Sequence, residues 1–147
     1  MTLIPPGLRV YIVEDSAILL NLLVAVVESA DAEVVGTSDN AERAIRELPG
    51  LKADLILLDI ALRSGTGFDV LRALQSCGNA APVSRVVLTN YTTTEYRRNS
   101  FRLGATHFFD KSSECSHAIA LITKLAAARR TGRARADREQ REPNGHH

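Results

Sequence analysis

Short apolar runs alternate along this chain with longer segments whose apolar residues follow a helical period. The runs are rich in β-branched residues, and the third shows no polar alternation, as expected for a strand covered on both faces. They predict five strands, at Leu8–Val13, Val34–Thr37, Ala53–Leu58, Val83–Leu88 and His107–Phe109. The chain is therefore predicted to be an α/β protein of five βα units.

Capping residues and chain breakers delimit five predicted helices. Ser16 can cap a helix that runs to about Glu28, and Asn40 can cap one that ends before Pro49-Gly50. The other helices are expected at Phe68–Gln75, from Thr92–Thr94 to about Gly104, and from a cap at Ser112 or Ser113 through Glu114 to about Arg130. Right-handed crossovers would place helices on both faces of one doubly wound parallel sheet.

Polar side chains stand directly after four of the predicted strands, as Glu14-Asp15, Asp59, Thr89 and Lys111. The carboxyl ends of parallel strands form the crevice in which ligands bind. The fold would therefore gather three carboxylates, a hydroxyl and an ammonium at one edge. Such a group can hold a divalent cation, supply a nucleophilic carboxylate and grip a phosphoryl group.

Each of these residues also has an ordinary structural explanation when it is taken alone. Asp59 can end a turn or cap a helix, and Glu14-Asp15 can form a solvated loop. Lys111 can be a surface lysine, and Thr89 a β-branched residue that ends a strand. The four positions together, each after a strand, favour a functional site.

The order and spacing of these motifs resemble the receiver domain of bacterial two-component response regulators. The matching stretches are Val10–Asp15, Asp54–Asp59, Val86–Thr89 and Gly104–Lys111. The resemblance covers about residues 8–130 and implies a flavodoxin-like (βα)5 receiver fold. Residues 1–7 would form a lead and residues 131–147 a charged tail.

The resemblance implies a role for each residue of the site. Asp59 would accept the phosphoryl group as an acyl phosphate, and Asp15 and Asp59 would bind Mg²⁺ or Mn²⁺. The backbone carbonyl of Ala61 would be a third metal ligand, and Glu14 would act through a metal-bound water. Lys111 would hold a phosphoryl oxygen as a point charge.

The same resemblance implies a switch. A phosphohistidine of a sensor histidine kinase or histidine phosphotransfer protein would donate its phosphoryl group in line to Asp59. The Thr89 hydroxyl would move toward the new phosphate, and Phe108 would change rotamer with it, unless Phe108 is plain core. The surface of the fourth helix, fifth strand and fifth helix would then change.

Two loops depart from the usual sequence of the family. Ser112 follows Lys111 where many receivers have proline, and a trans bond is expected because a non-proline cis bond costs about 2.5–4 kcal/mol. The loop after Asp59 reads Leu62–Gly67 in place of the usual Pro-Gly, and its glycines keep the turn plausible.

The first predicted helix leaves little polar surface, since Ala17–Val27 is interrupted only by Asn21. At about 11 residues this stretch is too short for a bilayer, which needs about 20. Either the sheet and the second and fifth helices cover it, or it exposes a patch around Leu20 and Leu23 for a partner or a second copy. The surface of the fourth helix, fifth strand and fifth helix is the alternative for a homodimer.

Composition and charge narrow the class of protein. The chain has 147 residues, with 45% hydrophobic and 24% charged residues, which suits one soluble domain. Its net charge of +1 implies no polyanionic partner. Cys77 and Cys115 show no metal or redox spacing, and with no targeting or membrane signal a cytoplasmic location is expected.

The tail is rich in arginine, but its charges are mixed. Residues 129–147 hold six arginines beside Asp137, Glu139 and Glu142, and no aromatic residue for stacking on bases. Nucleic-acid binding is therefore not expected, and the tail should be a solvated extension of the last helix or disordered.

These observations predict a stand-alone receiver that signals through a phosphorylation-dependent protein contact and is not a turnover enzyme. The alternatives are the receiver part of a longer regulator and an intermediate in a phosphorelay. A phosphatase of related fold would carry a second Asp where Ala61 stands. A flavodoxin-like cofactor binder would need a phosphate-cradling loop where Glu14-Asp15 stand.

Ala61 and Tyr91 flank the reaction centre by family analogy, two residues after Asp59 and Thr89. We expect the bulky Tyr91 to hinder hydrolytic water, so Tyr91→Ala should lose its phosphoryl group several-fold faster than the wild type. Phosphate release from the phosphorylated proteins measures this, and an unchanged rate would exclude the role.

Overall fold

A computed structural model describes residues 7–78 and 81–141 of the chain. Its strands are β1 (Arg9–Val13), β2 (Glu33–Ser38), β3 (Leu55–Leu58), β4 (Ser84–Thr89) and β5 (His107–Asp110). All four neighbouring pairs are parallel, and the strand order is β2-β1-β3-β4-β5. The predicted doubly wound five-stranded sheet is confirmed.

The helices follow the predicted order, with differences at their ends. They are α1 (Ala17–Ser29), α2 (Ala41–Glu47), the short 3₁₀ helix η1 (Leu48–Gly50), α3 (Gly67–Gln75), α4 (Thr94–Arg102) and α5 (Cys115–Arg141). Ser16 and Asn40 cap α1 and α2 as expected, accepting hydrogen bonds from Leu19 and Arg43. Ser112 does not cap α5, because its hydroxyl donates to Asp110.

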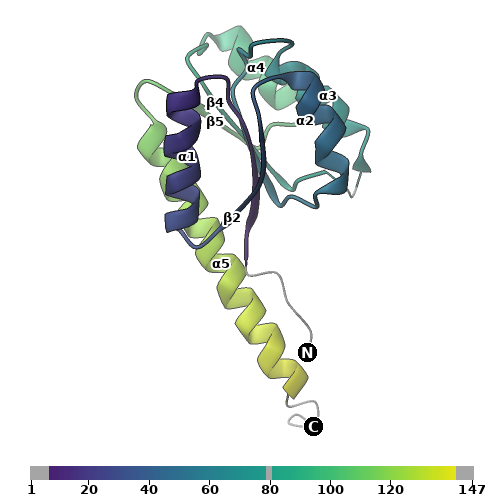
Figure 1. Cartoon of the computed structure of the whole chain (residues 1–147), viewed down its shortest axis with the longest axis vertical. Helices are drawn as coiled ribbons and strands as arrows, with labels where there is room; N and C mark the ends of the chain where they lie inside the picture. The colour runs from purple at the N-terminus through teal and green to yellow at the C-terminus, as the bar shows by residue number, and fades with distance from the viewer. Residues whose placement is uncertain (1–6, 79–80, 142–147) are drawn as a thin grey trace.

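Two helical layers enclose the sheet, with α1 and α5 on one face and α2, α3 and α4 on the other (Figure 1). Successive strand residues feed the two layers alternately, as the pleat requires. On β1, Val10 and Ile12 pack toward α1 and α5, whereas Tyr11 and Val13 pack toward α2 and α3. The central strands β1, β3 and β4 are therefore packed on both faces.

The apolar helix α1 is only partly covered. Leu23 is buried and Leu20 packs against the same core, so these two residues follow the first of the two alternatives and are covered by the fold. Ile18 and Leu22 are the exposed residues, at 84% and 58% exposure. The layer partner of α1 is α5, and α2 lies on the opposite face of the sheet. In the described part of the chain, no helix has the length and apolarity needed to cross a membrane.

The last helix runs past its expected end near Arg130 and continues to Arg141. Arg129 pairs with Asp54 at 2.8 Å, and Arg130 donates to the carbonyl oxygen of Ala30 at 2.9 Å. These contacts hold α5 against the amino edge of the sheet. Beyond them the helix projects away from the sheet (Figure 1).

Gly67, the first residue of α3, lies against the backbone that carries Asp59. A Cβ there would overlap the carbonyl oxygen of Asp59 and lie 2.9 Å from the Cα of Ile60. We expect Gly67→Ala to lower the free energy of unfolding by about 1–3 kcal/mol, because neither backbone atom can rotate away.

Gly50→Ala is the matched control, since a Cβ at Gly50 meets no atom within 4 Å. Urea denaturation of both variants measures the difference. Equal stabilities would contradict the predicted overlap.

Candidate functional site

The acidic residues of the site are placed by two neighbouring strands. Glu14 follows β1 and Asp59 follows β3, and the Asp59 N–H donates to the carbonyl oxygen of Val13 at 3.1 Å. One carboxylate oxygen from each of Glu14, Asp15 and Asp59 lies within 4.8 Å of the other two. The structure therefore brings together the three predicted carboxylates.

Two of these carboxylates are almost fully withdrawn from water. Glu14 is 2% exposed and Asp59 is 5% exposed, while Asp15 is partly buried. Burial raises the pKa of Glu14, although hydrogen bonds from the Ser16 N–H and from Lys111 oppose that shift. Three such groups at close range repel one another, so the site requires positive charge.

Lys111 supplies one positive charge from the end of β5. Its Nζ donates to Glu14 Oε1 at 2.9 Å and also to Asp59 Oδ2. Burial opposes the charged form of Lys111, but the hydrogen bonds to Asp59 and Glu14 outweigh it and raise the pKa. The ammonium therefore stays protonated and bridges the two buried carboxylates.

A hydrogen-bonded turn holds the backbone around Lys111. The Ser112 N–H and hydroxyl both donate to Asp110 Oδ1, at 2.9 and 2.6 Å, and the hydroxyl bond is the main cause of a lowered Asp110 pKa. The Asp110 N–H donates to Glu114 Oε1 at 2.8 Å. No peptide bond among residues 7–78 and 81–141 is cis, as expected for Lys111-Ser112.

Asp110 and Glu114 were not among the predicted site residues. An aspartate side chain often accepts a hydrogen bond from the backbone N–H two residues on, so Asp110 itself was a usable signal. The turn fixes the backbone from which Lys111 reaches into the site.

Thr89 and Ala61 form hydrogen bonds with the loops around the reaction centre. Thr89 is fully buried, and its hydroxyl accepts a hydrogen bond from the Tyr91 N–H at 3.2 Å. The Ala61 N–H donates to Asp59 Oδ1, also at 3.2 Å. Thr89 is also tied to the lysine loop, because the Lys111 N–H donates to its carbonyl oxygen at 2.8 Å.

Phe108 lies beneath α4 and is almost completely covered. Its ring centroid is 6.4 Å from that of Phe101, and the Arg97 guanidinium carbon lies 4.6 Å from the Phe108 centroid. Phe108 is therefore part of the core. Its change of rotamer on phosphorylation stays a prediction.

An aromatic pocket beside the carboxylates has no counterpart in the sequence analysis. It has a volume of about 310 Å³ and is lined by Ile60, Ala61, Thr66, Phe68, Tyr91 and Tyr96. These residues come from the loops after β3 and β4 and from α3 and α4. Only the fold brings these residues together, so no local sequence pattern predicts the pocket.

The chain matches the family model of the response regulator receiver domain over residues 10–123. It therefore belongs to the response regulator receiver family of two-component signalling proteins. The strand order and the acidic cluster beside Lys111 agree with that membership.

Its curated relatives include much longer proteins. The chain is 34% identical over 79 residues to a protein-glutamate methylesterase/protein-glutamine glutaminase of Nocardioides sp., covering 53% of this chain and 22% of that protein. The Bacillus subtilis protein of the same name is 33% identical over 107 residues, covering 72% and 30%. The chain thus spans less than a third of either relative.

Solved receiver structures share the fold. The response regulator domain of Thermotoga maritima CheB gives a TM-score of 0.71 at 21% identity, covering 82% of this chain and 97% of that one. The receiver domain of a Pseudomonas aeruginosa sensor histidine kinase gives 0.69 at 20% identity, covering 82% and 98%. That second structure has a magnesium ion coordinated in its active-site cleft.

Since one ammonium faces three carboxylates, a divalent cation should stabilise the folded chain. At a Mg²⁺ concentration a hundredfold above the dissociation constant, the gain in unfolding free energy should be about 2.7 kcal/mol. We expect Asp15→Asn to lose most of this gain and, without metal, to be at least as stable as the wild type because repulsion is relieved.

Thermal or urea unfolding with and without Mg²⁺ measures both effects. Glu28→Gln, at the exposed far end of α1, is the control and should keep the full gain. A Mg²⁺ gain in Asp15→Asn equal to that of the wild type would rule out Asp15 as a ligand.

Proposed function

We propose that Asp59 accepts a phosphoryl group from a phosphohistidine of a sensor histidine kinase or histidine phosphotransfer protein, with the help of a divalent cation. The observation that carries this proposal is the position of Asp59 itself. Its buried carboxylate stands between acidic neighbours that suit a metal and an ammonium that suits a phosphoryl oxygen.

The donor set fits Mg²⁺ or Mn²⁺. Asp15 and Asp59 offer hard carboxylate oxygens, and Mg²⁺ uses few protein carboxylates and keeps several waters. Glu14 is already engaged by Lys111 and the Ser16 N–H, which suits contact through water. The Ala61 carbonyl would complete the set. When bound, the cation would neutralise charge on the phosphoryl oxygens.

The chain's own residues would then position and stabilise the transfer. One Asp59 oxygen attacks phosphorus in line, the bond from phosphorus to the donor nitrogen breaks, and that nitrogen keeps the electron pair. Lys111 exchanges its bond to Asp59 for one to a phosphoryl oxygen. The Ala61 N–H orients the Asp59 carboxylate through its 3.2 Å hydrogen bond.

Thr89 would report the phosphorylated state to the surface. Its hydroxyl accepts from the Tyr91 N–H, so moving that oxygen toward a phosphate disturbs the loop that leads into α4. Phosphorylation would therefore shift the population of conformations at α4, β5 and α5, where Phe108 is expected to follow. A protein partner would read this surface.

The output of the signal has two candidate arrangements. A stand-alone receiver, or a phosphorelay intermediate, would act through protein contact alone. In the other arrangement, this receiver controls another domain of a longer regulator. The similarity to methylesterases favours this arrangement. In both, the receiver itself is a phosphoacceptor and not a turnover enzyme, and Ala61 offers no acid for phosphatase chemistry.

Incubation with acetyl phosphate and Mg²⁺ tests the proposal. We expect the intact mass to rise by one phosphoryl group, and this gain to disappear in Asp59→Asn and after chelation of the metal. Asp31→Asn, at an exposed turn after α1, is the control and should be phosphorylated normally. Phosphorylation that persists in Asp59→Asn would refute the assignment.

A further inference from the structure

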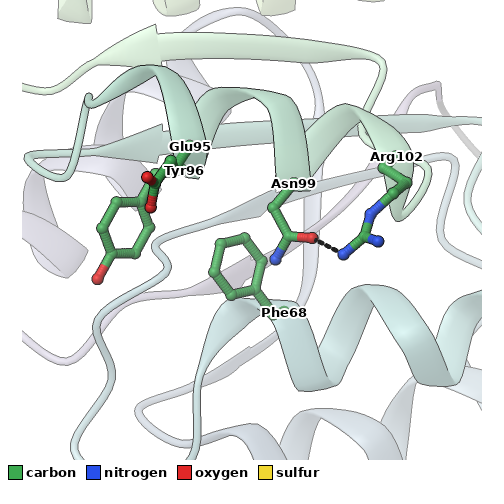
Figure 2. Close-up of a pocket in the computed structure, with 5 residues that line it drawn as sticks. All are labelled: Phe68, Glu95, Tyr96, Asn99 and Arg102. Atoms are coloured by element: carbon green, nitrogen blue, oxygen red, sulfur yellow. Dashed lines mark hydrogen bonds between the residues drawn. The ribbon is translucent and has the colours of Figure 1, made fainter.

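A second hollow lies between α3 and α4, outside the group of residues that would transfer the phosphoryl group. It has a volume of about 400 Å³ and is lined by Phe68, Glu95, Tyr96, Asn99 and Arg102. Phe68 comes from α3, and the other four side chains project from α4 (Figure 2). We call this hollow the α3–α4 groove. Its volume falls within the range of about 300–1,000 Å³ that is usual for sites of small ligands.

The aromatic surface of the α3–α4 groove suits a flat ring. The centroids of Phe68 and Tyr96 are 5.8 Å apart and their planes differ by 15°, so the two rings form one continuous surface. Both side chains are only partly buried, which leaves this surface open to a ligand. A nucleobase can stack on such a surface whatever its identity, so the rings would supply affinity without selecting the base.

Asn99 and Glu95 place two complementary hydrogen-bonding groups beside the rings. Arg102 donates to Asn99 Oδ1, and the Asn99 amide nitrogen, a donor, points toward Phe68 (Figure 2). The exposed Glu95 carboxylate only accepts hydrogen bonds. Guanine carries an acceptor, O6, beside two donors, N1–H and N2–H, whereas adenine has only one donor on that edge. A carboxylate next to an amide donor therefore favours guanine.

Arg102 adds a positive charge at the other end of the α3–α4 groove. It follows Glu95 by seven residues on α4, which places the two positions about 10 Å apart along the helix at 1.5 Å per residue. This separation is similar to the span from the base edge to the 5′-phosphate of an extended nucleotide. The planar guanidinium of an arginine matches the oxygens of a phosphate, and Arg102 is exposed.

We propose that the α3–α4 groove binds a guanine nucleotide. The base stacks on Phe68 and Tyr96, its edge donates to Glu95 and accepts from Asn99, and its phosphate contacts Arg102. The site is separate from Asp59 and goes beyond the proposed function, because it needs neither the phosphoryl group nor the divalent cation.

Calorimetric titration of the full chain with GDP, ADP and guanosine tests the proposal. EDTA is present, so that no metal can carry a nucleotide to the acidic cluster. We expect GDP to bind at least tenfold more tightly than ADP. Glu95→Gln should lower the affinity for GDP about tenfold, because the carboxylate accepts both guanine donors. Arg102→Gln should remove the preference for GDP over guanosine.

Arg98→Gln is the matched control for Arg102→Gln, because Arg98 is an exposed arginine of α4 that does not line the groove. This variant and Asp59→Asn should both bind GDP as tightly as the wild type does. The proposal would be overturned if GDP did not bind, or bound no better than ADP. It would also be overturned if Arg98→Gln weakened GDP as much as Arg102→Gln, or if Asp59→Asn abolished binding.

Discussion

Electrostatic crowding at one sheet edge is the constraint on which the rest of the site depends. Glu14, Asp15 and Asp59 present oxygens within 4.8 Å of one another, and two of these carboxylates are buried. Lys111 is the ammonium that bridges Glu14 and Asp59. Removing one partner of such a buried group typically costs several kcal/mol, so the lysine loop must be held firmly. The Asp110–Ser112 turn and the hydrogen bond to Thr89 do this without a proline.

Strand-end chemistry was predictable because the geometry of a parallel sheet is general. Residues that follow β1, β3, β4 and β5 meet at one edge whatever the intervening loops contain. The helix caps Ser16 and Asn40 were also predictable, because a capping hydrogen bond involves only residues within one helical turn. The motif residues of this receiver could therefore be located from the sequence.

Features that need three-dimensional neighbours were not predictable. Leu23 is buried by the rotation of α1 against α5, which an almost uniformly apolar helix does not reveal. Phe68, Tyr91 and Tyr96 come from separate segments and meet only in the folded chain. For the tail, the helical extension was one of two predicted alternatives, and α5 follows it to Arg141, because Gly132 weakens a helix by only about 1 kcal/mol and its arginine and alanine neighbours favour one.

The length of α5 magnifies any tilt that begins at the lysine loop. This helix begins just after the turn that holds Lys111, and its 27 residues span about 40 Å at 1.5 Å per residue. If the helix stays rigid, each degree of tilt at that turn would displace its far end by about 0.7 Å. A tilt of three degrees at that turn would thus displace the far end of the helix by about 2 Å. Arg129 and Arg130, which hold the helix at the amino edge of the sheet, would resist such a tilt.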